Sequence, residues 1–204
     1  VPKEIPDSKD ELFNLVLVKK ALPLIKASKG RAFVLATSLK SMEEIGALLK
    51  DELKKNEINY PVITQGEGPK SDLLQQFKKH GNAILIGSLS FWEGIDVRGP
   101  TLSLVIIDKL PFQSPGDPVF ESKIKLLSEE GINAFMSMQL PEAIIRLKQG
   151  VGRLIRDDYD KGVRVICDKR IIEKSYGIKI WKSLPPFKRT RNESAVINFL
   201  EELE

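Results

Sequence analysis

Short apolar runs alternate along the chain with longer segments in which apolar positions recur every three or four residues. Five runs have the length and composition of buried strands, at 32–36, 60–64, 83–87, 102–108 and 163–167. Four segments have the period of amphipathic helices, near 71–80, 119–130, 140–156 and 192–203. Continuous apolar strands separated by helices are typical of a parallel sheet that helices cover on both faces. The pattern therefore predicts one α/β domain over residues 1–204.

Two further helices are predicted from capping signals. The sequence Ser-Lys-Asp-Glu at 8–11 has the pattern of a capping box, and apolar positions continue after it as far as Leu22. We expect Pro23 to kink or restart this helix and Gly30 to end it. A second capping box, Ser-Met-Glu-Glu at 41–44, is expected to open the next helix.

The segment 113–139 is longer than a simple crossover between parallel strands requires. It begins with a cluster of turn formers, Pro115, Gly116 and Pro118, and we interpret it as a helical insertion in the domain. Ligands of open α/β sheets bind at the carboxyl ends of the strands. Candidate site residues are therefore expected at 37–38, 65–70, 88–96, 108–112 and 168–170.

Composition narrows the class of protein. Hydrophobic residues make up 42% of the 204 residues and charged residues 29%, which is typical of a globular domain. No apolar run approaches the roughly 20 residues that cross a bilayer, so we expect no membrane association. The single cysteine, Cys167, excludes an internal disulfide and a cysteine-ligated metal cluster, and it favours a cytoplasmic protein. The net charge of +4 permits an acidic partner such as nucleic acid.

The octet Gln-Gly-Val-Gly-Arg-Leu-Ile-Arg at 149–156 carries the most specific chemical signal. On a helix, Gln149, Arg153 and Arg156 share one face, while the apolar residues among them point towards the sheet. A guanidinium is permanently charged and offers a planar fork of donors to phosphate oxygens. The two glycines cost about 1 kcal/mol each in a helix, which is expected where a ligand approaches the backbone, so Gly152 is assigned to a nucleotide site. The alternative is a surface helix whose arginines pair with the acidic residues that follow.

The loop at 66–71 imitates a phosphate-binding loop, because it lies between a strand and a helix and ends in Lys-Ser. The full spacing G-x-x-x-x-G-K-[ST] is absent, however. Pro69 removes a backbone donor, and Glu67 would repel a phosphate. We exclude this loop as an ATP site and retain Gln65 and Lys70 as candidate contacts to DNA.

Several segments together resemble the DinG/XPD-type branch of the superfamily-two DNA helicases. The octet at 149–156 resembles motif VI, and Ser-Phe-Trp-Glu-Gly-Ile-Asp-Val-Arg-Gly at 90–99 resembles motif V. Further similarity to the bacterial DinG/YoaA group lies at 104–112 and 184–186, with all motifs in the expected order. The resemblance implies a RecA-like fold and the second motor domain of an ATP-dependent helicase that moves 5′→3′ on DNA in repair or replication.

The resemblance also implies roles for individual residues. Arg153 and Arg156 would contact the γ-phosphate of ATP as arginine fingers, and Gln149 would couple the two motor domains. The motif V loop would contact the nucleotide through Glu93, Gly94 and Asp96. The track for single-stranded DNA would include side chains that follow the strands, namely Thr37, Ser38, Gln65, Lys70, Ser88, Ser90 and Trp92. Ordinary helix capping by Thr37 and Ser38, and core packing by Trp92, are the alternatives.

Features that an ATP-dependent helicase requires are absent from this sequence. It contains no Walker A motif, no DEAH-type box and no set of four cluster-ligating cysteines. In the family these belong to the first motor domain, which would bind most of the ATP and Mg²⁺ and hold a 4Fe–4S cluster. We expect the parent protein, with partners in replication or repair, to be the active enzyme, and this part alone to be inactive and metal-free. The start at Val1 is interpreted as a cut within a longer protein. A non-catalytic basic module that binds nucleic acid is the alternative.

Overall fold

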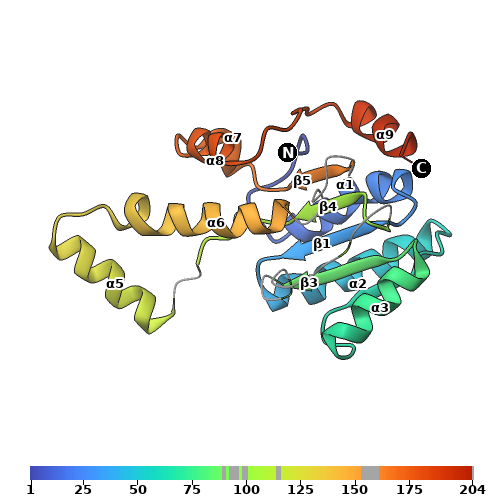
Figure 1. Ribbon diagram of the computed structural model, residues 1–204, viewed down its shortest axis with the longest axis horizontal. Helices are drawn as coiled ribbons and strands as arrows, with labels where there is room; N and C mark the ends of the chain where they lie inside the picture. The colour runs from blue at the N-terminus through green and yellow to red at the C-terminus, as the bar shows by residue number, and fades with distance from the viewer. Residues whose placement is uncertain (89–90, 92–96, 98–100, 114–115, 153–160, 204) are drawn as a thin grey trace.

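The central sheet contains five parallel strands in the order β2-β3-β1-β4-β5. The computed structural model, drawn in Figure 1, describes residues 1–88, 91, 97, 101–113, 116–152 and 161–203. The strands are β1 (Ala32–Ala36), β2 (Val62–Thr64), β3 (Ile84–Ser88), β4 (Leu104–Ile107) and β5 (Val163–Ile166). The predicted α/β class and parallel sheet are confirmed, and each strand lies within a residue or two of its predicted bounds.

Side chains alternate between the two faces of the sheet, and each face has its own layer of helices. Val34 of β1 pairs with Ile86 and Ile106 in register, and all three belong to the core cluster beneath one layer of helices. Their neighbours Leu35 and Ile107 belong to the cluster on the opposite face. The first layer comprises α1 (Phe13–Ala27), α2 (Leu39–Lys55) and α9 (Glu193–Glu201), and the second includes α3 (Lys70–His80), α6 (Leu140–Val151) and α8 (Gly177–Ser183).

The start of α1 differs from the prediction. The helix begins at Phe13 with no side-chain cap, because the carboxylates of Asp7 and Asp10 accept hydrogen bonds from nearby backbone N–H groups in turns before the helix. The predicted capping box at 8–11 is therefore wrong. The helix also continues through Pro23 without restarting.

After α1, Gly30 allows the chain to turn sharply into β1. Its φ is +79°, and a Cβ at this position would lie 2.5 Å from the carbonyl oxygen of Asn82. Glycine is consequently required at this position in the connection between α1 and β1. The last helical residue is Ala27, and the Gly30 N–H donates to the carbonyl oxygen of Ile25 at 2.9 Å, so Gly30 also closes the end of the helix as predicted.

The second predicted capping box is also displaced. α2 begins at Leu39, and the Ser38 hydroxyl accepts a hydrogen bond of 3.1 Å from the backbone N–H of Ser41. Ser41 thus lies inside the first turn of the helix and does not open it. The displacement places the N-terminus of α2 directly after the carboxyl end of β1.

An arm of helices connects β4 to α6. It contains α5 (Pro118–Glu129) and a five-residue π-helix, η2 (Phe135–Gln139), which continues into α6. Figure 1 shows α5 extending away from the sheet, while α6 runs back from the arm to the strands. The predicted helix near 119–130 is therefore present, whereas the π-helical turn has no counterpart in the prediction.

Two short helices between β5 and α9 were not predicted, namely α7 (Arg170–Glu173) and α8. They pack through Ile171 and Ile180 against the α6 side of the sheet. On the same stretch of chain, the buried Cys167 confirms the predicted core thiol, and burial raises its pKa to about 12. Among the described residues, no helix is long and apolar enough to cross a membrane.

Candidate nucleotide and nucleic-acid site

Polar side chains meet along the carboxyl edge of the sheet, where all five parallel strands end. Along this edge, a residue at or just after the end of each strand is bonded to a neighbour or is in register with one. Gln65 after β2 is bonded to Ser88 of β3, Ser88 is in register with Ala36 of β1, and Thr37 after β1 is bonded to Asp108 after β4. The final link joins Asp168 after β5 to the segment after β4. The bonds along this edge form three groups, which are centred on the Gln65–Ser88 pair, on Asp108 and on Asp168.

Asp108 is the centre of a buried network between β1, α2 and β4. Its carboxylate accepts hydrogen bonds from the backbone N–H of Thr37 at 3.0 Å, the Thr37 hydroxyl at 3.2 Å and the Ser41 hydroxyl at 3.1 Å. A further bond comes from the backbone N–H of Lys109. The Asp108 side chain is fully buried, and burial raises its pKa even though these hydrogen bonds favour the charged form. Asp108 therefore fixes the start of α2 to the end of β4.

The network extends from Asp108 towards α1. The Ser41 hydroxyl also lies 3.1 Å from the side-chain oxygen of Asn14, whose amide donates to Glu44 at 2.9 Å. Asn14 and Ser41 are both buried, so these contacts form a polar connection through the layer of α1 and α2. The first turn of α2 is consequently held from two sides.

Thr37 and Ser38 both have hydrogen-bond partners within the domain. Both donors of Thr37, its N–H and its hydroxyl, are directed at Asp108. Ser38 accepts a hydrogen bond as the N-cap, and a hydroxyl that accepts can still donate its own hydrogen. Ser38 is exposed at the positive end of the α2 dipole, which favours an anion there.

Gln65 and Ser88 come together from two adjacent strands. The Gln65 side-chain oxygen accepts from the backbone N–H of Ser88 at 2.7 Å and from its hydroxyl at 2.8 Å. Ser88 is buried, and its hydroxyl points at Gln65 in this arrangement. The pair fixes the point at which the chain leaves β3 for the segment that resembles motif V.

Lys70 and the loop before it behave as expected for a structural turn. Glu67 accepts a hydrogen bond of 2.9 Å from the Thr64 N–H and pairs with Lys50 at 2.9 Å. The Lys70 ammonium lies 5.2 Å from the centre of the Phe91 ring, which is buried in the core. A carboxylate directed into the loop disfavours a phosphate there, in agreement with the exclusion of this loop as an ATP site.

Asp168 organises the end of the edge next to β5. It is buried, accepts from the backbone N–H of Leu110 at 2.8 Å and binds the Arg170 guanidinium at 2.6 Å. The Arg170 guanidinium also lies 5.3 Å from the ring of Phe112. Asp168 thus joins the segments after β4 and β5, and Arg170 balances its charge.

α6 packs on the sheet as predicted, but it ends at Val151, whereas the prediction continued the helix to residue 156. Leu147 and Val151 are buried, while Gln149 is exposed on the opposite side of α6. The carbonyl of Val151 accepts a hydrogen bond of 2.6 Å from Nε of Arg164 in β5. Gly152 follows as the C-cap. The remaining predicted residues, Arg153, Arg156, Glu93, Gly94, Asp96, Ser90 and Trp92, lie outside the described residues.

Sequence reasoning missed the three residues that organise the edge and the helix. Asp108 and Asp168 lie only within the expected candidate ranges 108–112 and 168–170, and the sequence does not single out Arg164. A signal for the two acids exists, because each directly follows an apolar strand or its last apolar residue. An acidic residue at the end of a buried strand needs donors nearby. No comparable signal marks Arg164.

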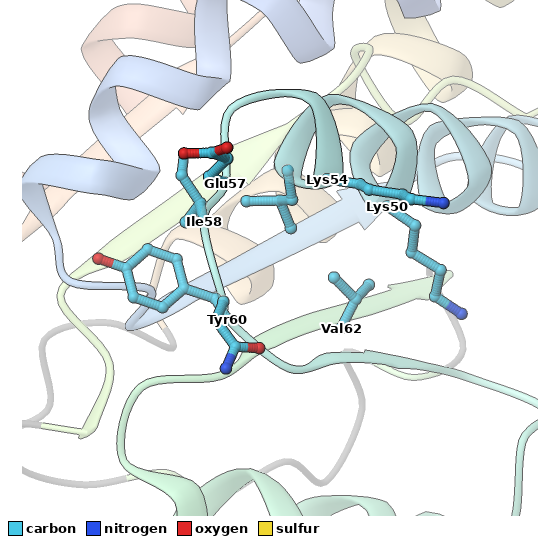
Figure 2. A pocket seen from close by; sticks show the side chains of 8 residues that line it. Lys50, Lys54, Glu57, Ile58, Tyr60 and Val62 are labelled. Carbon is cyan, nitrogen blue, oxygen red and sulfur yellow. The ribbon is translucent and has the colours of Figure 1, made fainter.

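A groove in the described part of the chain lies at the amino end of β2, away from the carboxyl edge of the sheet. It has a volume of about 490 Å³ and is lined by residues at the end of α2 and the start of β2, including Lys54, Glu57, Tyr60 and Val62. Figure 2 shows these side chains around an open hollow. Because it lies at the amino end of β2, it is separate from the polar network. No group of three or more His, Cys, Asp or Glu that could hold a metal occurs among the described residues.

Comparison with known proteins identifies the family of the chain. Residues 21–187 match the helicase C-terminal domain family. The chain is 49% identical over 178 residues to the ATP-dependent DNA helicase YoaA of Escherichia coli, covering 87% of this chain and 27% of that protein. It is 35% identical over 191 residues to the ATP-dependent helicase DinG of Mycobacterium tuberculosis, covering 94% of this chain and 28% of that protein. The chain therefore spans less than a third of the length of these relatives.

A solved structure supports the fold. A structure titled as an XPD helicase matches 89% of this chain and 32% of its own, with a TM-score of 0.64 and 20% sequence identity. The predicted RecA-like fold and the resemblance to DinG/XPD-type helicases are therefore confirmed.

Proposed function

The chain belongs to the helicase C-terminal domain family, and on that premise we propose that it is the second motor domain of an ATP-dependent helicase that moves 5′→3′ on DNA. The two curated relatives named above are ATP-dependent helicases, one of them a DNA helicase by name. The parent protein would supply a first motor domain that binds most of the ATP and Mg²⁺ and holds a 4Fe–4S cluster. Its partners would be single-stranded DNA and proteins of repair or replication.

The observation that carries the proposal is the bonded edge of the sheet. Thr37 opens the connection from β1 to α2, and Ser88 precedes the motif V-like segment at 90–99. Hydrogen bonds to Asp108 and Gln65 hold Thr37 and Ser88 at the same edge of the sheet. In a motor domain, the loops that contact nucleic acid and the loops that contact nucleotide must move as one body. The reason is that closure of the two motor domains shifts both sets of loops together. Rigid bonds between the strand ends meet that need.

For DNA, we assign the backbone-facing contacts to the exposed start of α2 and the neighbouring loops. Ser38 would donate to a phosphate at the positive end of the helix dipole, and Lys70 would add positive charge at the start of α3. Thr37, Gln65 and Ser88 would act mainly by holding these loops in place, because their donors and acceptors are used inside the network. Ser90 and Trp92 complete the proposed track. Contacts of this kind are insensitive to base sequence and sensitive to salt.

For ATP, we assign the arginine fingers to Arg153 and Arg156, with Gln149 exposed on the preceding turn of α6 as the coupling residue. Glu93, Gly94, Asp96 and Gly152 would line the same nucleotide. An arginine finger stabilises charge that develops on the transferred phosphoryl group, by about 10³–10⁵ in rate. The fingers act only in the complete protein, because this chain contains no Walker A motif.

The test uses the full-length parent protein with Arg156→Ala and, as a matched control, Arg189→Ala. We expect Arg156→Ala to abolish ATP hydrolysis stimulated by single-stranded DNA while binding to single-stranded DNA at low salt persists. Arg189 contacts Trp181 in another part of the chain, so its replacement should leave turnover unchanged. If Arg156→Ala turns over ATP as fast as the control, a non-catalytic module that binds nucleic acid is the better account.

A further inference from the structure

β5 places one arginine on the face of the sheet that α6 covers. Val163, Val165 and Cys167 pack on the α1 side, whereas Ile166 packs with α6 and α8 on the other side. Successive strand residues point to opposite faces, so Arg164 shares the face of Ile166. A guanidinium between a strand and its covering helix is an unusual choice, because most positions facing a helix layer are apolar.

The Arg164 guanidinium has two described contacts. Its Nε donates to the carbonyl oxygen of Val151 at 2.6 Å, and its central carbon lies 3.9 Å from the centre of the Phe187 ring. Burial lowers the pKa of Arg164 to about 10, so the group remains charged at neutral pH despite the loss of water. A cation beside a carbonyl in the last turn of a helix is also favoured by the helix dipole.

Arg164 bonds to the last turn of α6, which contains two glycines. Gly150 and Gly152 flank Val151, and glycine weakens a helix because it retains more freedom in the unfolded chain. Gln149 lies in the same turn and is exposed. The bond from Arg164 also joins the two ends of the segment 152–163, because residue 164 lies directly after this segment and residue 151 directly before it.

We propose that Arg164 is a positioning residue for ATP hydrolysis, which aligns the last turn of α6 with Gln149 and the arginines that follow it in the sequence. The inference rests on the proposed roles of Arg153 and Arg156. Arg164 itself does not contact the nucleotide. It acts through its bond to the Val151 carbonyl and its stacking on Phe187, which together fix the base of the arginine segment.

The test replaces Arg164 in the full-length parent protein. Arg164→Met keeps the length of the side chain and removes its charge and donors. A misplacement of about 1 Å can slow an enzyme about a hundredfold, so we expect the kcat of DNA-stimulated ATP hydrolysis to fall about ten- to a hundredfold. The KM for ATP and the affinity for single-stranded DNA should stay within about threefold of their original values, because other residues hold both ligands. Arg164→Lys keeps a charged donor and should restore most of kcat.

Arg189→Met is the matched control, because Arg189 likewise donates to a backbone carbonyl, at 3.0 Å, and lies over an aromatic ring, at 4.7 Å. Turnover of the control should be unchanged. A kcat for Arg164→Met equal to that of the control overturns the proposal. If Arg164→Met fails to fold, Phe187→Leu removes only the stacking surface and should lower kcat severalfold. Turnover of Phe187→Leu equal to that of the control then overturns the proposal instead.

A double substitution separates this inference from the proposed function. In a protein that already carries Arg153→Ala and Arg156→Ala, Arg164→Met should slow the residual single-turnover hydrolysis of ATP little further, because the arginines that it positions have gone. If the fold-losses in rate of the arginine and Arg164 substitutions multiply fully when they are combined, the positioning role is overturned. If Arg156→Ala alone leaves turnover intact, the proposed function fails. If Arg156→Ala slows turnover and Arg164→Met does not, only the inference about Arg164 fails.

Discussion

Asp108→Ala removes the acceptor on which four hydrogen bonds at the carboxyl edge converge. The donors are the N–H and hydroxyl of Thr37, the hydroxyl of Ser41 and the N–H of Lys109. The hydroxyls can rotate towards other acceptors, and Ser41 already lies 3.1 Å from the Asn14 side-chain oxygen. The two backbone N–H groups have no such freedom. Their loss of a partner sets the expected cost.

The magnitude follows from these two N–H groups. Leaving a buried donor unsatisfied costs about 1–3 kcal/mol, so two donors cost about 2–6 kcal/mol in total. Part of this cost is offset, because burial already disfavours the charged Asp108 carboxylate that is removed. Water also reaches Thr37 and Lys109, which are only partly buried. We therefore expect Asp108→Ala to lower the free energy of unfolding by about 2–4 kcal/mol.

Urea-induced unfolding of the chain, followed by circular dichroism, measures this loss. Asp117→Ala is the matched control, because Asp117 also accepts two backbone N–H bonds, at 2.9 and 3.2 Å, but at the exposed start of α5. Loss of such an N-cap costs about 1 kcal/mol. Equal losses for Asp108→Ala and Asp117→Ala would refute the reasoning, because the buried network would then contribute no more than an ordinary cap.

The same carboxylate also predicts a dependence on pH. Burial raises the pKa of Asp108 above its usual 3.8, so the folded chain retains this proton at pH values where the unfolded chain has lost it. Ionisation of Asp108 therefore lowers stability as the pH rises above 3.8. The side chain at position 108 of Asp108→Asn cannot ionise. The unfolding free energy of the original chain minus that of this variant should therefore fall as the pH rises above 3.8. A difference that grows with pH would contradict the assigned shift.

Two other predictions concern Gln65 and Cys167. Gln65→Glu keeps both bonds to Ser88 and should preserve the stability of the domain. Its added negative charge should weaken the binding of single-stranded DNA by the parent protein, measured by fluorescence anisotropy. Unchanged binding at low salt would remove Gln65 from the DNA track. Cys167, whose pKa burial raises to about 12, should not react with a thiol reagent at pH 8 in the folded chain and should react fully in denaturant. Rapid labelling of the folded chain would contradict the burial of this thiol.

The layers of the fold were predictable because apolar runs and helical periods are local signals. The run at 32–36 is apolar at every position, and the structure confirms a strand that is buried on both faces. Helix starts were less predictable, because several polar residues compete for the same N–H groups. Asp7 and Asp10 accept the bonds before α1, and Ser38 caps α2 three residues before the expected start. The short helices α7 and α8 are too brief to show a period.

The candidate site was predictable only in part, because its bonds join residues far apart in sequence. Thr37 and Gln65 were expected at the correct edge, since each follows a strand. Their partners Asp108 and Ser88 are 71 and 23 residues away, and no local pattern specifies the pairing. Likewise, nothing near Arg164 in the sequence indicates that its side chain binds the carbonyl of Val151, 13 residues earlier.

The central claim is that this domain completes an ATP site on a neighbouring domain of the same protein. Single-turnover hydrolysis of ATP by the full-length protein with Arg153→Ala and Arg156→Ala combined tests it most directly. We predict that the rate of hydrolysis with single-stranded DNA falls about 10³-fold or more, while the Kd for ATP changes only severalfold. An unchanged single-turnover rate, with ATP bound and DNA present, would contradict the claim.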